Sequence, residues 1–171
     1  MARKSRQVES RMVVEYLKDT YSQFSYITNC PLGKVDEALM REVGYKSALG
    51  ITRPFRPMVD AVVILPNYLV LVEAKVWQVL AGMSKLPFYK SLIPFTPELK
   101  DYLPREVLME LVVGQTNSNL EIMARDQGIA IKLYRPDWLA EVVASMNKYW
   151  TKEYRESREQ KLRMREALGL E

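Results

Sequence analysis

Residues 58–77 constrain the fold of this chain more than any other stretch. They contain two apolar runs rich in β-branched and aliphatic residues, separated by a Pro-Asn turn signal. Each run carries charge near the end far from the turn, with Asp60 in the first run and Glu73 and Lys75 in the second. The pattern predicts a β-hairpin, and three charges within it require a neutralising arrangement.

The register of this hairpin brings the charged residues together. A turn centred on Pro66 and Asn67 places Asp60 opposite Glu73. Proline does not adopt the positive φ of the favoured two-residue turns, so this register depends on a four-residue loop with the same centre. Because strand side chains alternate between faces, Lys75 shares the face of Glu73. Opposed carboxylates destabilise a strand pair, so we expect either Lys75 or a divalent cation between them.

The composition narrows the chemistry available at this hairpin. The chain of 171 residues contains no histidine, and Cys30 is its single cysteine. Disulfides within the chain, Cys/His zinc sites and histidine-dependent triads are therefore excluded, and Cys30 is expected to be structural. Acid–base chemistry must use Asp, Glu, Lys, Tyr or water. The net charge of +4 is compatible with a polyanionic partner without requiring one.

Hydropathy predicts an ordinary globular protein. Hydrophobic residues make up 48% of the chain and charged residues 27%. No apolar run approaches the roughly 20 residues of a membrane helix, and no apolar segment follows the basic N-terminus. We therefore expect neither a membrane segment nor a secretion signal. The expected location is the cytoplasm, or a virion if the protein is encoded by a phage.

Hydrophobic periodicity predicts helices and strands on both sides of the hairpin. Helical spacing of apolar residues predicts helices over residues 3–19, 35–42, 79–92 and 117–127, the third of them broken by Pro87. Short apolar runs predict strands over residues 21–29, 107–114 and 129–134. Residues 44–57 are predicted to form an irregular loop. The strand, helix, strand order of residues 107–134 implies a crossover and parallel pairing.

A long charged helix is predicted at the C-terminus, over residues 138–168. Its first half has an apolar stripe suited to packing on the sheet, whereas its second half carries dense i,i+4 charge pairs. Such a polar helix either projects into solvent or packs on another chain, as in a homo-oligomer or with an assembly partner. We expect a domain over residues 1–146 and a helical extension over residues 147–171. The predicted class is α/β, with a central mixed sheet of four to five strands flanked by helices.

The hairpin charges suggest a specific chemistry. Asp60 and Glu73, supplemented by the Ala74 carbonyl and waters, would form a site for Mg²⁺ or Mn²⁺. Lys75 would then orient the attacking water or stabilise negative charge on a phosphoryl group. Phosphodiester hydrolysis fits these groups and needs no histidine. The structural interpretation is an ion pair that joins two strands, but burying three charges costs several kcal/mol per ion unless each is satisfied.

The order of elements, with Asp60 on one strand and Glu73-Ala74-Lys75 on the next, resembles the PD-(D/E)XK nuclease superfamily. This superfamily includes restriction-endonuclease-like enzymes and Holliday-junction resolvases, and the resemblance covers about residues 5–135. It implies a restriction-endonuclease-like core with Asp60 and Glu73 as metal ligands and Lys75 as the catalytic lysine.

The resemblance also bears on residues outside the hairpin. In many members an acidic residue of the first helix joins the site, which implies Glu9 or Glu15 here. Val59 stands where the family name has proline. Some members carry Gln-X-X-X-Tyr on the helix after the lysine, where this chain has Lys85 and Tyr89.

The expected function is that of a Mg²⁺-dependent DNA endonuclease that uses metal-activated water. The candidate contacts to the DNA backbone are Arg53, Arg56, Lys85, Tyr89 and Lys90. The two arginines could instead pair with acidic side chains of the protein. Two alternatives remain open: a catalytically silent nuclease-like fold in a phage particle or nucleoprotein complex, and a DNA-binding module without catalysis.

Overall fold

The computed structural model describes residues 2–146 and 152–169. The chain forms two compact units, Met1–Tyr134 and Arg135–Glu171, and the first of them contains the whole sheet. No helix in the described residues is long and apolar enough to cross a bilayer.

The second unit contains the helices α6 (Asp137–Met146) and α7 (Lys152–Ala167). The domain boundary predicted between residues 146 and 147 lies at the edge of the segment 147–151, outside the described residues. The middle of the predicted C-terminal helix falls in the same segment. The described parts of that prediction, on both sides of the segment, are helical.

A five-stranded mixed sheet forms the centre of the first unit. Its strands lie side by side in chain order, namely β1 (Ser25–Pro31), β2 (Met58–Ile64), β3 (Tyr68–Lys75), β4 (Glu106–Val113) and β5 (Ile129–Leu133). The first three strands pair antiparallel, whereas β3, β4 and β5 pair parallel. The structure thus confirms the α/β class, the mixed sheet and the predicted parallel pairing of the last two strands.

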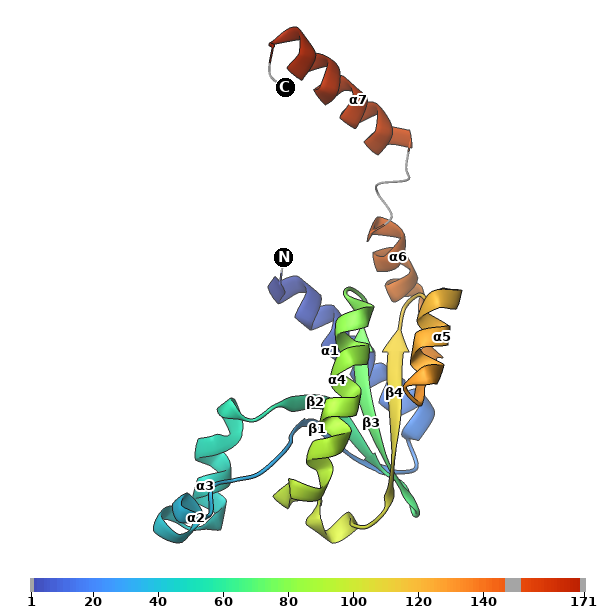
Figure 1. Ribbon diagram of the computed structural model, residues 1–171. Coiled ribbons are helices and arrows are strands. Elements are labelled where there is room, and N and C mark those ends of the chain that lie inside the picture. The colour runs from blue at the N-terminus through green and yellow to red at the C-terminus, as the bar shows by residue number, and fades with distance from the viewer. Residues whose placement is uncertain (1, 147–151, 170–171) are drawn as a thin grey trace. The chain divides into compact units, whose positions relative to one another are not determined.

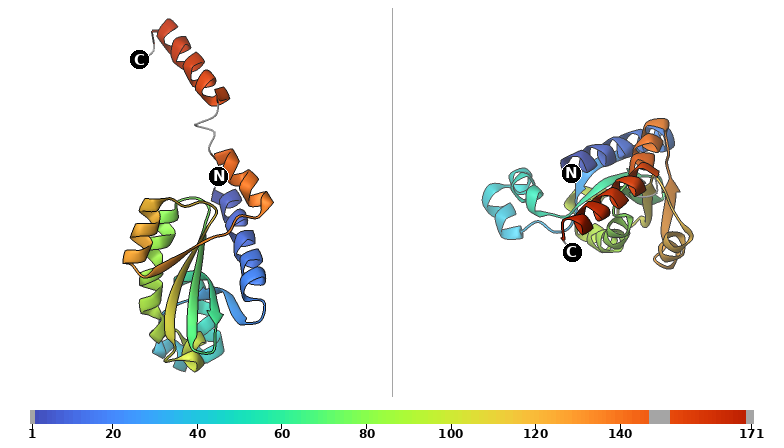
Figure 2. Two further views of the ribbon diagram at one scale, coloured as in Figure 1. Left: turned by 90° about the vertical axis from the view of Figure 1, so that its right-hand side faces the viewer. Right: turned by 90° about the horizontal axis from the view of Figure 1, so that it is seen from above.

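Helices cover both faces of this sheet. Figure 2 shows α1 (Ala2–Tyr21) on one face, and α4 (Val79–Leu92) and α5 (Ser118–Asp126) on the other. The stripe predicted for α1 is buried at Met12, Val13, Tyr16 and Leu17. On the other face, side chains of α4 pack with inward residues of β3 and β4 in one apolar core. Two 3₁₀ segments, η2 (Ile93–Phe95) and η3 (Pro97–Tyr102), lead from α4 towards β4.

The predicted hairpin register is confirmed. The pairs run from Ala61 with Val72 to Ile64 with Leu69, and the Leu65 amide donates to the Tyr68 carbonyl at 2.9 Å across the turn. Leu65 and Tyr68 therefore face each other across Pro66 and Asn67, and the turn centred on this pair keeps the predicted register. The charged residues consequently reach the same end of the two strands.

Two local predictions differ from the structure. The first strand begins at Ser25 and not at Tyr21, because α1 continues through Tyr21. Pro87 does not break α4, which runs through it without interruption. A proline removes one helical hydrogen bond, but α4 has buried residues on both sides of Pro87, at Leu86 and Tyr89, so packing of that face holds the helix together.

Residues 34–55 form a projection that we call the arm, visible beside the sheet in Figure 1. It contains α2 (Glu37–Val43), α3 (Tyr45–Thr52) and the 3₁₀ segment η1 (Arg53–Phe55). The prediction of an irregular loop over residues 44–57 is therefore wrong. Among the residues of α2 and α3 only Ala48 is buried. Because α3 packs so little surface against the core, its sequence carries no clear apolar stripe.

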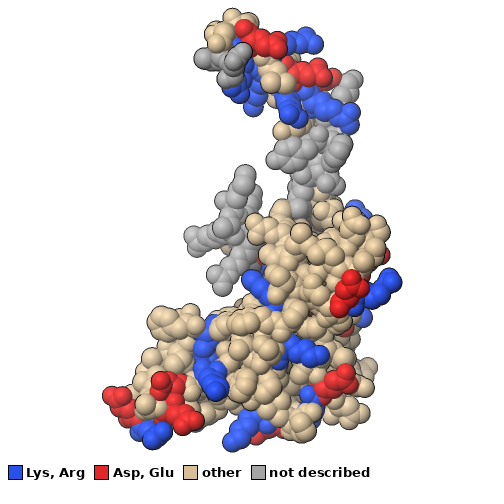
Figure 3. Space-filling model, viewed as in Figure 1, with Lys and Arg blue, Asp and Glu red and all other residues tan. Residues whose placement is uncertain are grey.

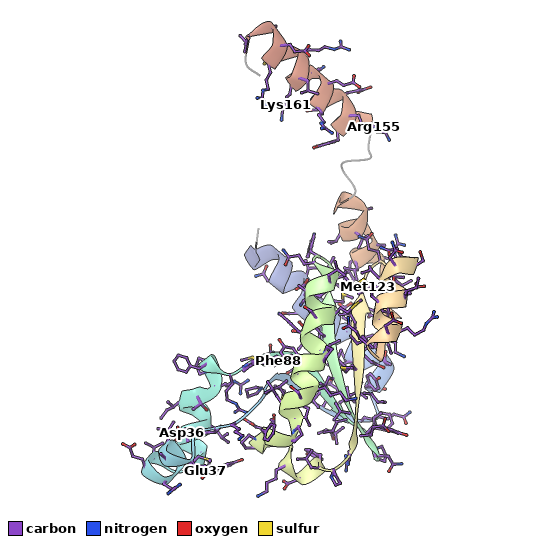
Figure 4. All side chains as sticks on the ribbon, in the orientation of Figure 1. Asp36, Glu37, Phe88, Met123, Arg155 and Lys161 are labelled. Atoms are coloured by element: carbon purple, nitrogen blue, oxygen red, sulfur yellow. The ribbon has the colours of Figure 1, made fainter. Side chains whose placement is uncertain are left out.

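Local backbone chemistry explains why the arm has two short helices. The Asp36 carboxylate caps α2 by accepting from the Ala38 amide at 2.7 Å. Gly44 has φ of +81°, which favours glycine, and ends α2 immediately before α3 begins. Acidic side chains gather at the outer end of the arm in Figure 3, where Figure 4 labels Asp36 and Glu37.

Candidate active site

A pocket of about 250 Å³ lies at the charged end of the hairpin. Residues of α1, β1, β2, β3 and α4 line it. The lining includes three carboxylates and two ammonium groups, those of Glu9, Asp60, Glu73, Lys75 and Lys85. The structure therefore brings all four residues predicted to be catalytic into one pocket, together with one predicted DNA contact.

Lys75 lies among the carboxylates. Its Nζ is 3.1 Å from Glu73 Oε1 and 4.0 Å from Asp60 Oδ2. The same Nζ donates to the Ala74 carbonyl at 2.9 Å, and Asp60 Oδ2 accepts from the Ala74 amide at 2.9 Å. We expected either Lys75 or a divalent cation between the two carboxylates. The structure places the ammonium group of Lys75 there.

Glu9 reaches this cluster from α1. Its Oε2 lies 3.5 Å from Lys75 Nζ, and its Oε1 accepts from the Val76 amide at 3.2 Å. Glu15, the other candidate on this helix, pairs with Arg11 at 2.7 Å and does not line the pocket. Glu9 is therefore the acid of the first helix that converges on the hairpin charges.

Burial makes Glu73 the most perturbed acid of the pocket. The residue is 2% exposed, and burial, followed by repulsion from Asp60, raises its pKa to about 7 despite the two nearby lysines. Among the described residues, its Oε2 is the one buried side-chain oxygen or nitrogen without a hydrogen-bond partner. A proton or a cation would satisfy this oxygen.

The neighbouring lysines have different surroundings. Burial acts to lower the pKa of Lys75, but the carboxylates of Glu73, Asp60 and Glu9 outweigh it and raise that pKa. Lys85 is half exposed, with its Nζ 3.8 Å from Glu73 Oε1. Lys75 therefore remains charged at neutral pH, and one carboxylate oxygen faces two ammonium groups.

The backbone of α4 approaches the pocket residue Lys75 closely, and this contact was not predicted from the sequence. A Cβ at Gly82 of α4 would lie 2.6 Å from Lys75 Cγ and 3.0 Å from Leu111 Cδ1. Asn29, which lines the pocket, has φ of +49°, and Gln78 has φ of +53° directly before α4. Such positive φ values in residues other than glycine cluster at functional sites. The one available signal was Gly82 inside a helical pattern.

The remaining predicted DNA contacts divide into two groups. Arg53 and Lys90 are exposed, and Arg53 donates to the carbonyl of the pocket residue Asn29 at 3.2 Å. Tyr89 lies in the apolar core, where burial raises its pKa to about 12. Arg56 is buried and pairs with Glu98. Neither Tyr89 nor Arg56 lines the pocket.

Cys30 has the environment expected of a structural cysteine. Its side chain is fully buried in the core. Burial, followed by the charge of Glu98, raises the pKa of its thiol to about 12. The thiol is therefore neutral and inaccessible, as the absence of histidine led us to expect.

The donor chemistry of the pocket fits a hard divalent cation. Mg²⁺ is usually held by one or two carboxylates, with waters or substrate phosphates as its other ligands. Asp60 and Glu73 provide such a pair, and Glu73 Oε2 is an acceptor without a donor. Within the described ranges, no group of three or more His, Cys, Asp or Glu residues is arranged to hold a metal ion, so a cation here would depend on this pair and on added ligands.

Comparison of the chain with protein-family models, curated proteins and solved structures found no match. The class of the site therefore rests on its geometry, which is an acidic pocket containing two lysines at one end of a mixed sheet.

Proposed function

We propose that this protein is a Mg²⁺-dependent DNA endonuclease that hydrolyses phosphodiester bonds. The observation that carries the proposal is the convergence of Glu9, Asp60, Glu73 and Lys75 in one pocket. The resemblance to PD-(D/E)XK nucleases supports it, since the same residues carry that motif. The element order from α1 to β5 agrees with the order on which the resemblance rests.

Each residue has a definite task in this proposal. Asp60 and Glu73 hold the ion, with the Ala74 carbonyl as a further oxygen donor. A divalent ion supplies Lewis-acid stabilisation of charge on a phosphoryl oxygen and acidifies water. Lys75, charged because of its acidic neighbours, donates a hydrogen bond to the attacking water or to a phosphoryl oxygen. Glu9 positions Lys75 through the 3.5 Å contact.

The pocket has room for one phosphodiester group of a polymeric substrate. Pockets that enclose drug-sized ligands measure about 300–1,000 Å³, whereas this one has about 250 Å³. A phosphodiester group fits such a space while the rest of the polymer lies outside it. Lys85, half exposed at the pocket, then offers its ammonium group to an adjacent phosphate.

Cleavage assays with site variants test this proposal. The full-length protein is incubated with plasmid, branched and single-stranded DNA in Mg²⁺ or Mn²⁺, beside Asp60→Asn, Lys75→Met and the exposed control Lys100→Met. Both site variants should lose activity by about 100-fold or more, the usual effect of removing an electrostatic group from an active site, while the control retains it. Metal-independent cleavage, or full activity in both site variants, contradicts the assignment.

A second candidate function is that of an assembly component with a silent nuclease-like fold. The observation in its favour is α7, whose Leu162 and Met164 are exposed among charged residues. Light scattering after size-exclusion chromatography tests it. A stable oligomer that dissociates on Leu162→Ser substitution and cleaves no DNA favours assembly, whereas a monomer that cuts DNA rules it out.

A further inference from the structure

Two places beside the pocket each combine a cation with an exposed phenylalanine. The first is η1, which carries Arg53 and Phe55, and Phe55 is 85% exposed. The second is α4, which carries Lys85 and Phe88, and Phe88 is 54% exposed. Burying a phenylalanine stabilises a protein by about 1.5–3 kcal/mol, and both side chains forgo much of that stabilisation beside the pocket.

Both pairs are tied to the pocket by position. Phe55 is three residues before Met58, which lines the pocket, so the intervening chain spans at most about 10 Å. Arg53 is hydrogen-bonded to Asn29, a second lining residue. Lys85 itself lines the pocket.

Phe88 lies on the same helical face as Lys85. Residues three apart on a helix are neighbours on its surface, so the Phe88 and Lys85 side chains leave α4 side by side. Figure 4 shows Phe88 on the side of α4 that faces the arm. Neither aromatic side chain lines the pocket, but each lies three residues along the chain from a residue that does.

This combination matches the chemistry of unpaired nucleic acid. Proteins that bind single strands combine cations for the phosphates with aromatic side chains on which the bases stack. In a base-paired duplex the faces of the bases are covered by the neighbouring base pairs, so they are not available for stacking on an exposed phenylalanine. The acidic outer end of the arm, with Asp36 and Glu37, disfavours a polyanion there and limits contact to the inner part near η1.

We infer that the substrate is a single strand, or a locally unpaired segment, whose bases stack on Phe55 and Phe88. Arg53 and Lys85 contact its phosphates beside these bases. The inference rests on the proposed function only in that one phosphodiester of the bound strand reaches the pocket. It names the class of nucleic acid, which the carboxylates and Lys75 do not determine.

Binding measured without cleavage tests this inference. Fluorescence anisotropy is recorded for the full-length protein with a labelled strand of about 20 nucleotides, its duplex and the RNA of the same sequence, with Ca²⁺ replacing Mg²⁺. We expect the wild type to prefer the single strand. Stacking is worth about 1–3 kcal/mol per base, so Phe55→Ala and Phe88→Ala should each weaken strand binding about 5- to 150-fold. Phe55→Trp should retain it.

A matched control and a second readout separate the possible results. Phe24 is an exposed phenylalanine just before β1, at the opposite end of that strand from Cys30, so Phe24→Ala should leave binding unchanged. Unchanged strand binding in both alanine variants, or equal affinity for duplex, overturns the inference. If the two alanine variants lose the preference for the single strand but the wild type cleaves no DNA, the result contradicts only the proposed endonuclease activity. Duplex cleavage at the wild-type rate by the double alanine variant contradicts only the inference, and the RNA arm shows whether the sugar matters.

Discussion

Arg56 provides the most direct test of the fold around the pocket. Its side chain is 5% exposed, and its Nη1 and Nη2 donate to the two Glu98 oxygens at 2.6 and 2.7 Å. The guanidinium also donates to three backbone carbonyls, those of Pro31, Leu32 and Gly33, at 3.0, 3.3 and 3.0 Å. It therefore joins the end of β1 to the segment after α4.

Replacing Arg56 with alanine should be strongly destabilising. The substitution leaves Glu98 and three carbonyls without their donor, and removing one partner of a buried ion pair costs about 3–5 kcal/mol. In a protein of this size each kcal/mol corresponds to about 2–4 °C, so the melting temperature should fall by about 6–20 °C. Arg53→Ala, which removes an exposed side chain with a single hydrogen bond to Asn29, should cost about 0.5 kcal/mol or less.

Urea unfolding followed by circular dichroism measures both variants. The expected result is a clear fall in the midpoint for Arg56→Ala with a similar slope, and little change for Arg53→Ala. The structural assignment would be refuted if Arg56→Ala retained wild-type stability but lost affinity for DNA. That outcome would return Arg56 to the phosphate-contacting role considered from the sequence.

Two further predictions concern the pocket wall and its acid. Gly82→Ala should destabilise the protein by about 1–3 kcal/mol through overpacking, because the new Cβ would lie 2.6 Å from Lys75 Cγ. The control Gly50→Ala, whose Cβ meets no other atom, should be neutral or stabilising. Equal unfolding midpoints for the two variants would contradict this prediction. The pKa of Glu73 is about 7 in the folded protein, whereas the ordinary pKa of a glutamate is 4.5, so the folded state holds this proton to a higher pH than the unfolded state does. Stability should therefore fall as pH rises from 4.5 to 7, and a Glu73→Gln variant should lack that slope in urea titrations at several pH values.

The hairpin could be predicted because its determinants are local. Two short apolar runs mark the strands and the Pro-Asn pair marks the turn, so the register follows from a short stretch of chain. The observed pairing of Ala61 with Val72 confirms it. Only part of the arm could be predicted in the same way. The helix predicted over residues 35–42 is present as α2, whereas α3, which buries only Ala48, was predicted to be part of a loop.

The arginines show the opposite case. Arg53 and Arg56 are three residues apart in one basic segment, and in the sequence they are equivalent candidates for a phosphate contact. The fold separates them, since Arg56 is buried against Glu98 while Arg53 stays exposed beside Asn29. The partner that distinguishes them, Glu98, is distant along the chain, and local patterns carry no information about such contacts.

For the site as a whole, the sequence by itself determined the register of the hairpin. It thereby determined that Asp60, Glu73 and Lys75 lie at the same end of it. Only the tertiary structure decided that Glu9 and not Glu15 joins them, that α4 approaches closely at Gly82, and that Lys85 faces Glu73. The physical reason is range. Strand alternation and turn geometry act over a few residues, whereas these contacts depend on how separate helices pack against the two faces of the sheet.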